Sequence, residues 1–398
     1  MSNRIKLFAI IFTCLSTTNH VFSQGQIGID ELSGGLNSLR HAVPFLVIAP
    51  DSRAGAMGDV GAASTPDVNS QHWNPAKYAF ADKEWGAALS YTPWLRNLIN
   101  DINLTYLGGY MKIDDMQAVS ATLLYFSMGD ITFTNEANVP QQTHSPNEFA
   151  FDVAYSRKFA DKISGAIAFR YIRSDLTGGY SQQGQGSFTA GSAVAADVSM
   201  YYQTPLVINN KNYETALGIN ISNIGSKLSY NEEKKDFIPI NMRVGGRFTS
   251  KIDEYNSVTF LLDFNKLLVP TPPVRDPEDQ TVILAGKESD VPVPTGMFQS
   301  FYDAPGGFSE ELHEISYSGG IEYWYSGQFA IRAGYFDEHS TKGNRKYFTV
   351  GAGLKYNVFN LDFAYLMPRS GQANPLANTV RFSLSFEFER ARKGAKKR

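Results

Sequence analysis

The side chains best suited to acid–base chemistry are three histidines, His144, His313 and His339, which fall near the outer rim, in a long connection or at the ends of segments that read as strands. An enzyme acting on lipids would pair such a histidine with a serine or an aspartate. The chain contains no G-x-S-x-G, no H-E-x-x-H and no cluster with metal-ligand spacing. We therefore expect no catalytic residue, no metal and no cofactor, and a lipid-modifying hydrolase stays an alternative that would need these histidines.

Apolar and polar residues alternate along about fourteen segments between Trp85 and Phe388, as in strands whose two faces meet different surroundings. A tilted membrane strand needs about 9–11 residues, and its sheet must close because lipid offers no partner to a free edge. We predict an all-β fold, a 14-stranded antiparallel transmembrane β-barrel over 84–389. The segments run roughly 84–94, 101–113, 116–129, 148–159, 162–176, 190–205, 213–225, 238–250, 256–269, 313–327, 329–339, 346–357, 359–368 and 379–389.

The connections between these segments alternate in length. Those after even-numbered segments are very short, such as Asp114-Asp115, Ala160-Asp161, Gln328 and Val358. Those after odd-numbered segments are long, near 130–147, 177–189, 226–237, 270–312 and 369–378. Tight periplasmic turns at one end and extended extracellular loops at the other give this parity. If the strand boundaries were assigned wrongly, short and long connections would not alternate in this way.

Composition agrees with a barrel in the outer membrane of a Gram-negative bacterium. The 398 residues are 43% hydrophobic and 13% aromatic, yet mean hydropathy is only −0.25. A barrel gives such a mean because half of each strand faces the polar lumen. Past the extreme N-terminus no stretch reads as a membrane helix, and the net charge of −3 argues against a nucleic-acid surface.

The first 23 residues read as a secretory signal peptide. Arg4 and Lys6 precede an apolar run from Leu7 to Leu15, and residues 21–23 suit a cleavage site. The single cysteine, Cys14, lies inside the run, so a mature chain beginning near Gln24 would contain no thiol. A lipoprotein anchor at Cys14 is the alternative, although residues 11–13 make a poor lipobox.

Alternation also assigns side chains to the two faces of the barrel. The side chains that we expect to face lipid are Trp85, Leu89, Tyr91, Phe149, Phe151, Val153, Tyr155, Ile163, Ile167, Phe169, Tyr171, Val258, Phe260, Leu262, Phe264, Phe348, Val350, Leu354 and Tyr356. The lumen receives six acids and six bases: Asp152, Arg170, Asp197, Arg243, Arg247, Asp263, Glu322, Arg332, Lys355, Asp362, Arg381 and Glu387. A matched set favours pairing across a filled or narrow lumen. A solvated lumen is the alternative for the charges, and a soluble β-sandwich is the alternative for the outward apolar rows.

Residues 24–83 precede the first strand and are rich in glycine and alanine, notably between Ser52 and Ser64. Small residues let backbone pack closely against backbone, which suits a hatch inside a barrel better than an exposed linker. Trp73-Asn74-Pro75-Ala76 follows and also reads as a turn into the first strand.

Several of these motifs occur in one order that resembles a known family. Ala54-Gly55-Ala56-Met57-Gly58-Asp59, Asn74-Pro75-Ala76 and fourteen strands resemble the FadL-like barrel superfamily, in which an N-terminal hatch fills the barrel. Within it, residues 42–46, 49–58, 71–77 and 91–95 look like the PorV family of the type IX secretion system. The resemblance covers essentially the whole mature chain.

The resemblance implies a role in protein export in a Bacteroidota-type bacterium. Such a barrel receives cargo with a C-terminal signal domain from a giant translocon barrel and delivers it to the complex that attaches cargo at the cell surface. The implied partners are therefore the translocon, cargo domains, the attachment complex and outer-membrane lipid, but no nucleic acid. A FadL-like transporter of hydrophobic small molecules is the alternative, since one fold hosts many functions.

A docking role needs extracellular contacts, and the 270–312 connection is unusually apolar for a loop. Its Pro-flanked segments read as extended chain able to pair with a partner, and its aromatics as interface anchors. The alternatives are a loop folded over its own barrel mouth and, for the patch near Trp94, interfacial anchoring. The predicted partner-binding residues are Trp94, Leu95, Leu98, Val282, Ile283, Leu284, Val291, Val293, Met297, Phe298, Phe301 and Tyr302.

The chain continues past the last expected strand into a basic tail, 390–398. We expect this periplasmic tail to be solvated and disordered, with contact to anionic headgroups or to an acidic periplasmic protein as the alternative.

Overall fold

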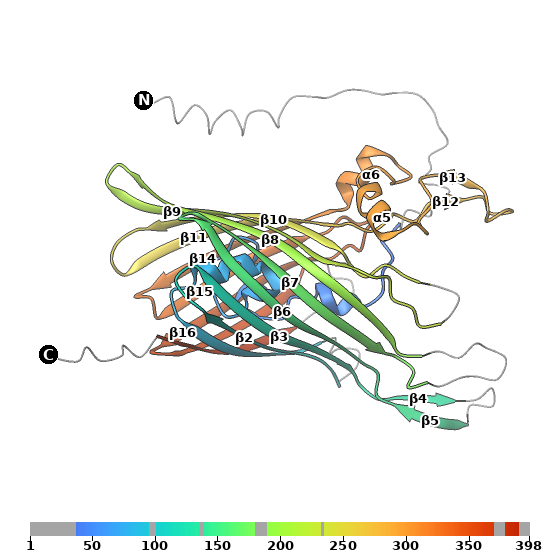
Figure 1. The fold of residues 1–398 in the computed structure, drawn as a ribbon, viewed down its shortest axis with the longest axis horizontal. Helices are drawn as coiled ribbons and strands as arrows, with labels where there is room; N and C mark the ends of the chain where they lie inside the picture. The colour runs from blue at the N-terminus through green and yellow to red at the C-terminus, as the bar shows by residue number, and fades with distance from the viewer. Residues whose placement is uncertain are drawn as a thin grey trace. The chain divides into compact units, whose positions relative to one another are not determined.

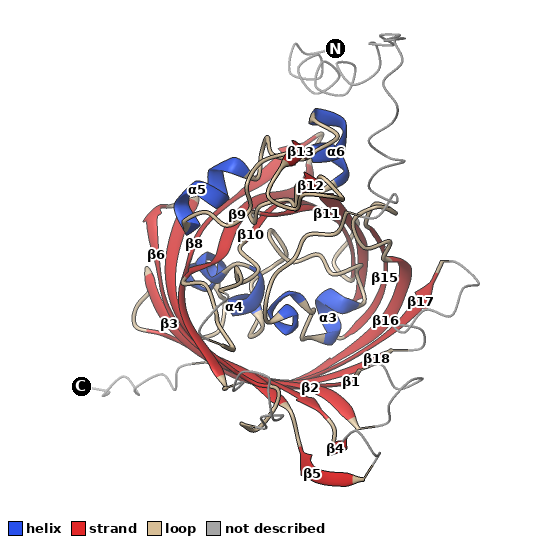
Figure 2. Cartoon of the chain, turned by 90° about the vertical axis from the view of Figure 1, so that its right-hand side faces the viewer, coloured by secondary structure: helices blue, strands red, loops and turns tan. Residues whose placement is uncertain are grey.

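The computed structural model describes residues 37–94, 101–134, 139–179, 189–231, 235–369 and 379–389, which form a closed barrel of 14 antiparallel strands (Figures 1 and 2). The strands are β1 Trp85–Pro93, β2 Ile102–Lys112, β3 Gln117–Met128, β6 Asn147–Ala160, β7 Ile163–Asp175, β8 Gly191–Ile208, β9 Lys211–Gly225, β10 Asn241–Lys251, β11 Asn256–Leu267, β14 Ile315–Tyr325, β15 Phe329–Asp337, β16 Lys346–Tyr356, β17 Phe359–Pro368 and β18 Val380–Phe388. Each pairs with the next, and β18 closes on β1. The predicted fold class is confirmed.

The seam between the first and last strands runs from Trp85 opposite Phe388 to Tyr91 opposite Phe382. The rings of Trp85 and Phe388 stack with their centroids 4.1 Å apart. Every strand of the barrel therefore has hydrogen-bonded neighbours on both sides, which a hydrocarbon environment requires.

Burial alternates along the strands as predicted. On β11, Phe260, Leu262 and Phe264 are exposed on the outer surface, whereas Leu261 and Asp263 are buried. The predicted inward charges on the other strands are buried too, apart from half-buried Lys355 and Glu387 near the ends of β16 and β18. The assignment of the two faces is confirmed, and the soluble sandwich is wrong.

The short turns and long connections lie at opposite ends of the barrel (Figure 1). Two of the long connections contain structure of their own: the hairpin β4 Ile131–Thr134 and β5 Pro140–His144, and the group β12 Val274–Arg275, β13 Ile283–Ala285, α5 Val293–Gln299 and α6 Phe308–His313. Among the described residues, no helix is both long and apolar enough to cross a membrane.

Several strand boundaries differ from the predictions by two or three residues. β8 and β9 continue to a two-residue turn, because Asn209 and Asn210 both adopt the left-handed conformation that tight hairpins need. β10 begins at Asn241 rather than 238, after Pro239, which has no N–H for a ladder. β14 begins at Ile315 rather than 313 because α6 occupies the residues before it.

The lumen holds residues 49–81, which we call the luminal segment (Figure 2). It contains α3 Ser52–Gly55, α4 Ser70–Trp73 and η2 Pro75–Phe80, and it follows η1 Pro44–Val47. α3 lies against β16, β17 and β18, and η2 lies against β3, β6, β7 and β8. The predicted signal peptide 1–23 with Cys14, the first part of the predicted hatch and the tail 390–398 fall outside the described residues. The division into signal peptide, hatch and barrel stays a prediction.

Glycines bring the luminal segment against the barrel wall. A Cβ at Gly334 of β15 would lie 2.0 Å from the carbonyl carbon of Met57, whereas Gly319 of β14 has nothing within 4 Å of that position. The wall and the luminal segment are thus in backbone contact, and Gly334 leaves no room for a side chain.

We predict that Gly334→Ala displaces the chain around Met57 and destabilises the folded barrel by about 1–3 kcal/mol, the usual effect of overpacking. The temperature at which the compact form seen on unheated gels is lost measures this. Gly319→Ala is the matched control and should behave as wild type. Equal melting of both variants would contradict the close packing.

Candidate functional site: the luminal segment and the extracellular cap

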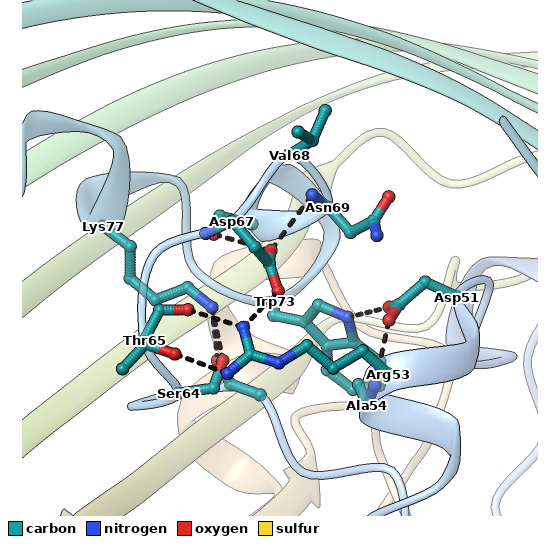
Figure 3. A network of polar contacts seen from close by, with 12 residues as sticks. Asp51, Arg53, Ala54, Ser64, Thr65, Asp67, Val68, Asn69, Trp73 and Lys77 are labelled. Carbon is teal, nitrogen blue, oxygen red and sulfur yellow. Dashed lines mark hydrogen bonds and ion pairs between the residues drawn. The ribbon is translucent and has the colours of Figure 1, made fainter. Parts of the chain in front are cut away.

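A polar network holds the luminal segment in one conformation (Figure 3). Asp51 accepts the N–H of Ala54, at 2.9 Å, and the indole N–H of Trp73, at 2.6 Å. The ammonium of Lys77, fully buried, donates to the Gly61 carbonyl, at 2.9 Å, and to the Ser64 hydroxyl, at 2.8 Å. Side chains therefore satisfy the backbone of a segment with very little regular structure.

Arg53 joins this network to the barrel wall. It donates to Asp67 of its own segment, at 2.8 Å, and through two nitrogens to Glu322 of β14, at 3.0 and 2.9 Å. Glu322 also accepts from Arg332 of β15, at 2.7 Å, and Arg332 contacts Asp362 of β17, at 2.6 Å. These charges alternate in sign, so each buried arginine meets two carboxylates.

Two further contacts fix the luminal segment to other strands. Arg381 of β18 pairs with Asp59, at 2.8 Å. Asp263 of β11 accepts the backbone N–H groups of Gly61 and Ala62, at 2.7 and 2.8 Å. The prediction that luminal charges are paired is confirmed for these groups. Sequence analysis identified the wall residues, but it missed Arg53 and Asp59 as their partners.

Arg170 of β7 shows the same pairing within the wall itself. It contacts Asp152 of β6 and, at 3.2 Å, Asp197 of β8, all three being buried. Arg243 of β10 instead lies over the ring of Trp73, 4.5 Å from its centroid. The solvated lumen is therefore wrong for these residues.

A cavity of about 480 Å³ lies between the luminal segment and the extracellular mouth. Phe45, Trp94 and Phe126 form part of an apolar wall, and charged groups of both signs, among them Arg345 and its partner Glu338, line the rest. Trp94, predicted to bind a partner, is half-buried here, against the cluster that contains Phe45. Leu95 and Leu98 lie outside the described residues.

Residues 270–314 fold into a compact unit, which we call the cap. Its predicted extended Pro-flanked run is wrong in part, because Val293–Gln299 forms α5 with a proline in the first turn, where proline fits a helix. β13 pairs with β12 of the same loop, with Ile283 opposite Arg275 and Ala285 opposite Val274. The cap therefore has internal structure before any partner binds.

The cap has an inner and an outer apolar face. Val291, Val293 and Met297 pack against the core cluster at the barrel rim, as expected for a loop that folds onto its own barrel. Val282, Leu284, Phe298, Phe301 and Tyr302 are exposed, Phe298 by 73%. Phe308 and Leu312, which sequence analysis did not single out, are exposed as well.

Charged groups in and beside α6 tie the cap to the barrel. Lys266 of β11 contacts Glu311, at 3.0 Å, and Glu314, at 2.7 Å. Lys342, between β15 and β16, contacts Glu310, at 2.5 Å, and Glu314, at 3.0 Å. Both lysines are buried. Removing one member of such a network leaves a buried charge without a partner, which is strongly destabilising. The network therefore fixes the position of the cap.

The three histidines do not form one group. His313 ends α6 and stacks on His339, with ring centroids 3.5 Å apart. His144 ends β5, which lies on the other side of the barrel (Figure 2), and is 3.4 Å from Asp175. Within the described ranges, no three His, Cys, Asp or Glu side chains gather in a way that could hold a metal ion.

We predict that Glu322→Gln destabilises the folded protein by about 3 kcal/mol, because it leaves Arg53 and Arg332 short of a buried counter-charge. Glu387→Gln is the matched control, since its 3.4 Å contact with half-exposed Lys355 resembles a surface pair worth below about 1 kcal/mol. Thermal unfolding in detergent and protease access to residues 49–81 measure both. A control variant as unstable as Glu322→Gln would contradict the role of Arg53.

A second prediction concerns pH and Asp303 of the cap. Burial raises the pKa of Asp303 to about 6. The carboxyl group of Asp303 therefore binds a proton more tightly in the folded cap than in the unfolded chain. The stability that this protonation contributes is present at low pH and is lost as pH rises through about 6. Relative to Asp303→Asn, wild-type amides in α5 should exchange faster near pH 7 than near pH 4.5. A rate ratio that is independent of pH would count against this assignment.

Comparison with known proteins gives the family. Residues 34–274 match the family described as type IX secretion system protein PorV. Similar solved structures include the Pseudomonas putida toluene transporter TodX, with 11% identity, 86% of this chain and 99% of that chain covered and a TM-score of 0.48. The Ralstonia pickettii toluene transporter TbuX has 10% identity, 87% and 100% coverage and a TM-score of 0.45.

A Pseudomonas aeruginosa FadL homologue shows 10% identity, covers 87% of this chain and 100% of that chain, and has a TM-score of 0.43. A search of curated proteins found no match. The family match spans more than half of the sequence and includes the luminal segment and every barrel strand from β1 to β11. The chain therefore belongs to the PorV family of type IX secretion system proteins, and it is a barrel of the Gram-negative outer membrane.

Proposed function

We propose that this barrel is a shuttle and docking component of the type IX system. It receives cargo with a C-terminal signal domain from the giant translocon barrel and delivers it to the surface attachment complex. The protein is then located in the outer membrane of a Bacteroidota-type bacterium. The proposal rests on membership of the family together with the properties of the cap and the lumen.

The filled lumen supports a role other than a pore. Residues 49–81 are held by buried contacts to β11, β14 and β18, through Asp263, Glu322 and Arg381. A folded domain or an extended peptide would have to break these contacts to pass. Cargo that reaches the cell surface by another route would instead meet the outside of this protein.

The cap is the observation that carries the proposal. Phe298 and Tyr302 are exposed on a unit whose inner face is already packed and whose α6 is held by ion pairs. Exposed aromatic residues on a preorganised surface are typical interface anchors, because little conformational entropy is lost on binding. Val282, Leu284, Phe298 and Tyr302, all among the predicted partner-binding residues, are each exposed, which supports this role.

The test is recovery of partners in mild detergent. We expect wild-type barrel to retain a very large barrel protein and secreted cargo, and Phe298→Ser with Tyr302→Ser to retain about tenfold less, which corresponds to a loss of about 1.4 kcal/mol of binding free energy for the two anchors together. Val207→Ser with Ile208→Ser is the matched control, because these residues are exposed at the opposite end, in the β8–β9 hairpin. Equal recovery by both variants would remove the cap from the proposal.

A second candidate, a FadL-like transporter of hydrophobic small molecules, is favoured by the cavity of about 480 Å³. That volume is within the ~300–1,000 Å³ range of small-molecule sites, and the aromatic walls of the cavity suit an apolar molecule. A deletion strain that loses fatty-acid uptake but secretes normally would favour this candidate over docking.

A further inference from the structure

Lys266 occupies a position of β11 that alternation assigns to lipid. Phe260, Leu262 and Phe264 face outward at every second residue before it, and Lys266 continues that row. Its side chain is nevertheless only 6% exposed. A charged amine at the lipid-facing surface of a barrel is destabilising unless something covers and neutralises it.

α6 supplies that cover from outside the barrel. Glu311 and Glu314 contact the Lys266 ammonium, at 3.0 and 2.7 Å. Figures 1 and 2 both draw α6 outside the ring of strands, and the contacts with Lys266 place it beside the end of β11. The cap therefore overhangs the outer wall of the barrel, where the membrane begins, rather than closing the mouth alone.

A narrow groove of about 180 Å³ lies between the wall and the overhang. One side is formed by Met242 and Val244 of β10, Phe264 of β11 and Ile315 of β14, all at outward-facing positions of neighbouring strands. The wall of the groove is thus a continuation of the lipid-facing surface.

The other side of the groove comes from the cap. Phe301, Phe308 and Leu312 line it, and the last two are four residues apart on α6. Phe308 is 77% exposed although Glu310 and Glu311 on the same helix are turned into ion pairs. α6 therefore has two faces. Its apolar face, with Phe308 and Leu312, borders the groove, and its acidic face, with Glu310 and Glu311, forms ion pairs with lysines of the barrel.

We propose that this groove holds an acyl chain of an outer-membrane lipid and that α6 lies in the membrane interface. Continuity with the lipid-facing strands supplies the occupant. The volume is below the ~300 Å³ of ordinary small-molecule sites, which fits part of a hydrocarbon chain and leaves no room for a helix or strand of another protein. Leu312 and Phe308 then contact lipid, while Phe298 and Tyr302 remain on the surface offered to proteins.

Single-cysteine labelling tests this, since the chain contains one cysteine and Cys14→Ser removes it. The environment-sensitive fluorophore NBD is attached to Leu312→Cys, Phe308→Cys or Phe298→Cys, and the barrel is reconstituted into phosphatidylcholine vesicles brominated on the acyl chains. We expect labels at 312 and 308 to lose most of their fluorescence relative to unbrominated vesicles, and the label at 298 to keep its own. Heat-modifiable migration confirms that each variant is folded.

Val244→Trp then separates occupation of the groove from proximity to the bilayer. The indole fills the groove from the strand side, so it should restore much of the fluorescence of the label at 312 without unfolding the barrel. Quenching that Val244→Trp leaves unchanged would overturn the acyl chain in the groove. An unquenched label at 312 that crosslinks to a co-purified protein would overturn lipid as the occupant.

Discussion

Closure of the backbone hydrogen-bond ladder in lipid is the constraint from which the other features follow. Because β18 pairs with β1, no strand of the barrel has a free edge, and each barrel strand must present one face to hydrocarbon and one to the lumen. Closure also fixes the register, which places Glu322 directly opposite Arg332 and Asp152 directly opposite Arg170. The buried ion pairs are therefore consequences of strand pairing, and the luminal segment adds the remaining counter-charges.

Sequence predicted the strands and their faces because a period of two residues is a local signal. It did not predict the contacts of Arg53 with Glu322, 269 residues away, or of Asp59 with Arg381, 322 residues away. Such pairs depend on which strands curve toward one another around the lumen. The cap was predicted as apolar, yet its helices α5 and α6 and its overhang were missed. One signal was available: Lys266 on a lipid-facing row requires acidic partners, and Glu310, Glu311 and Glu314 follow within the next connection.

The Gly- and Ala-rich run that carried the family resemblance has a packing explanation. Gly58 has a left-handed backbone and lies so close to Tyr335 that a Cβ would approach its backbone to 2.6 Å. Gly55 likewise lies under the Arg381 side chain that reaches Asp59. Only small residues allow the chain to approach the wall this closely while its polar groups still meet those of the strands. The motif therefore identifies a way of filling the lumen.

Other buried ion pairs give the cap a fixed orientation. Lys266 and Lys342 hold the acidic groups in and beside α6 from two directions, and Val293 and Met297 pack α5 onto the rim. A docking surface on a flexible loop would lose conformational entropy on binding, whereas a surface held by buried charges has lost it during folding. A helix resting in the membrane interface adds a third support. The aromatic residues of the cap are then presented at a set height above the bilayer, which favours partners that are themselves embedded in the same membrane.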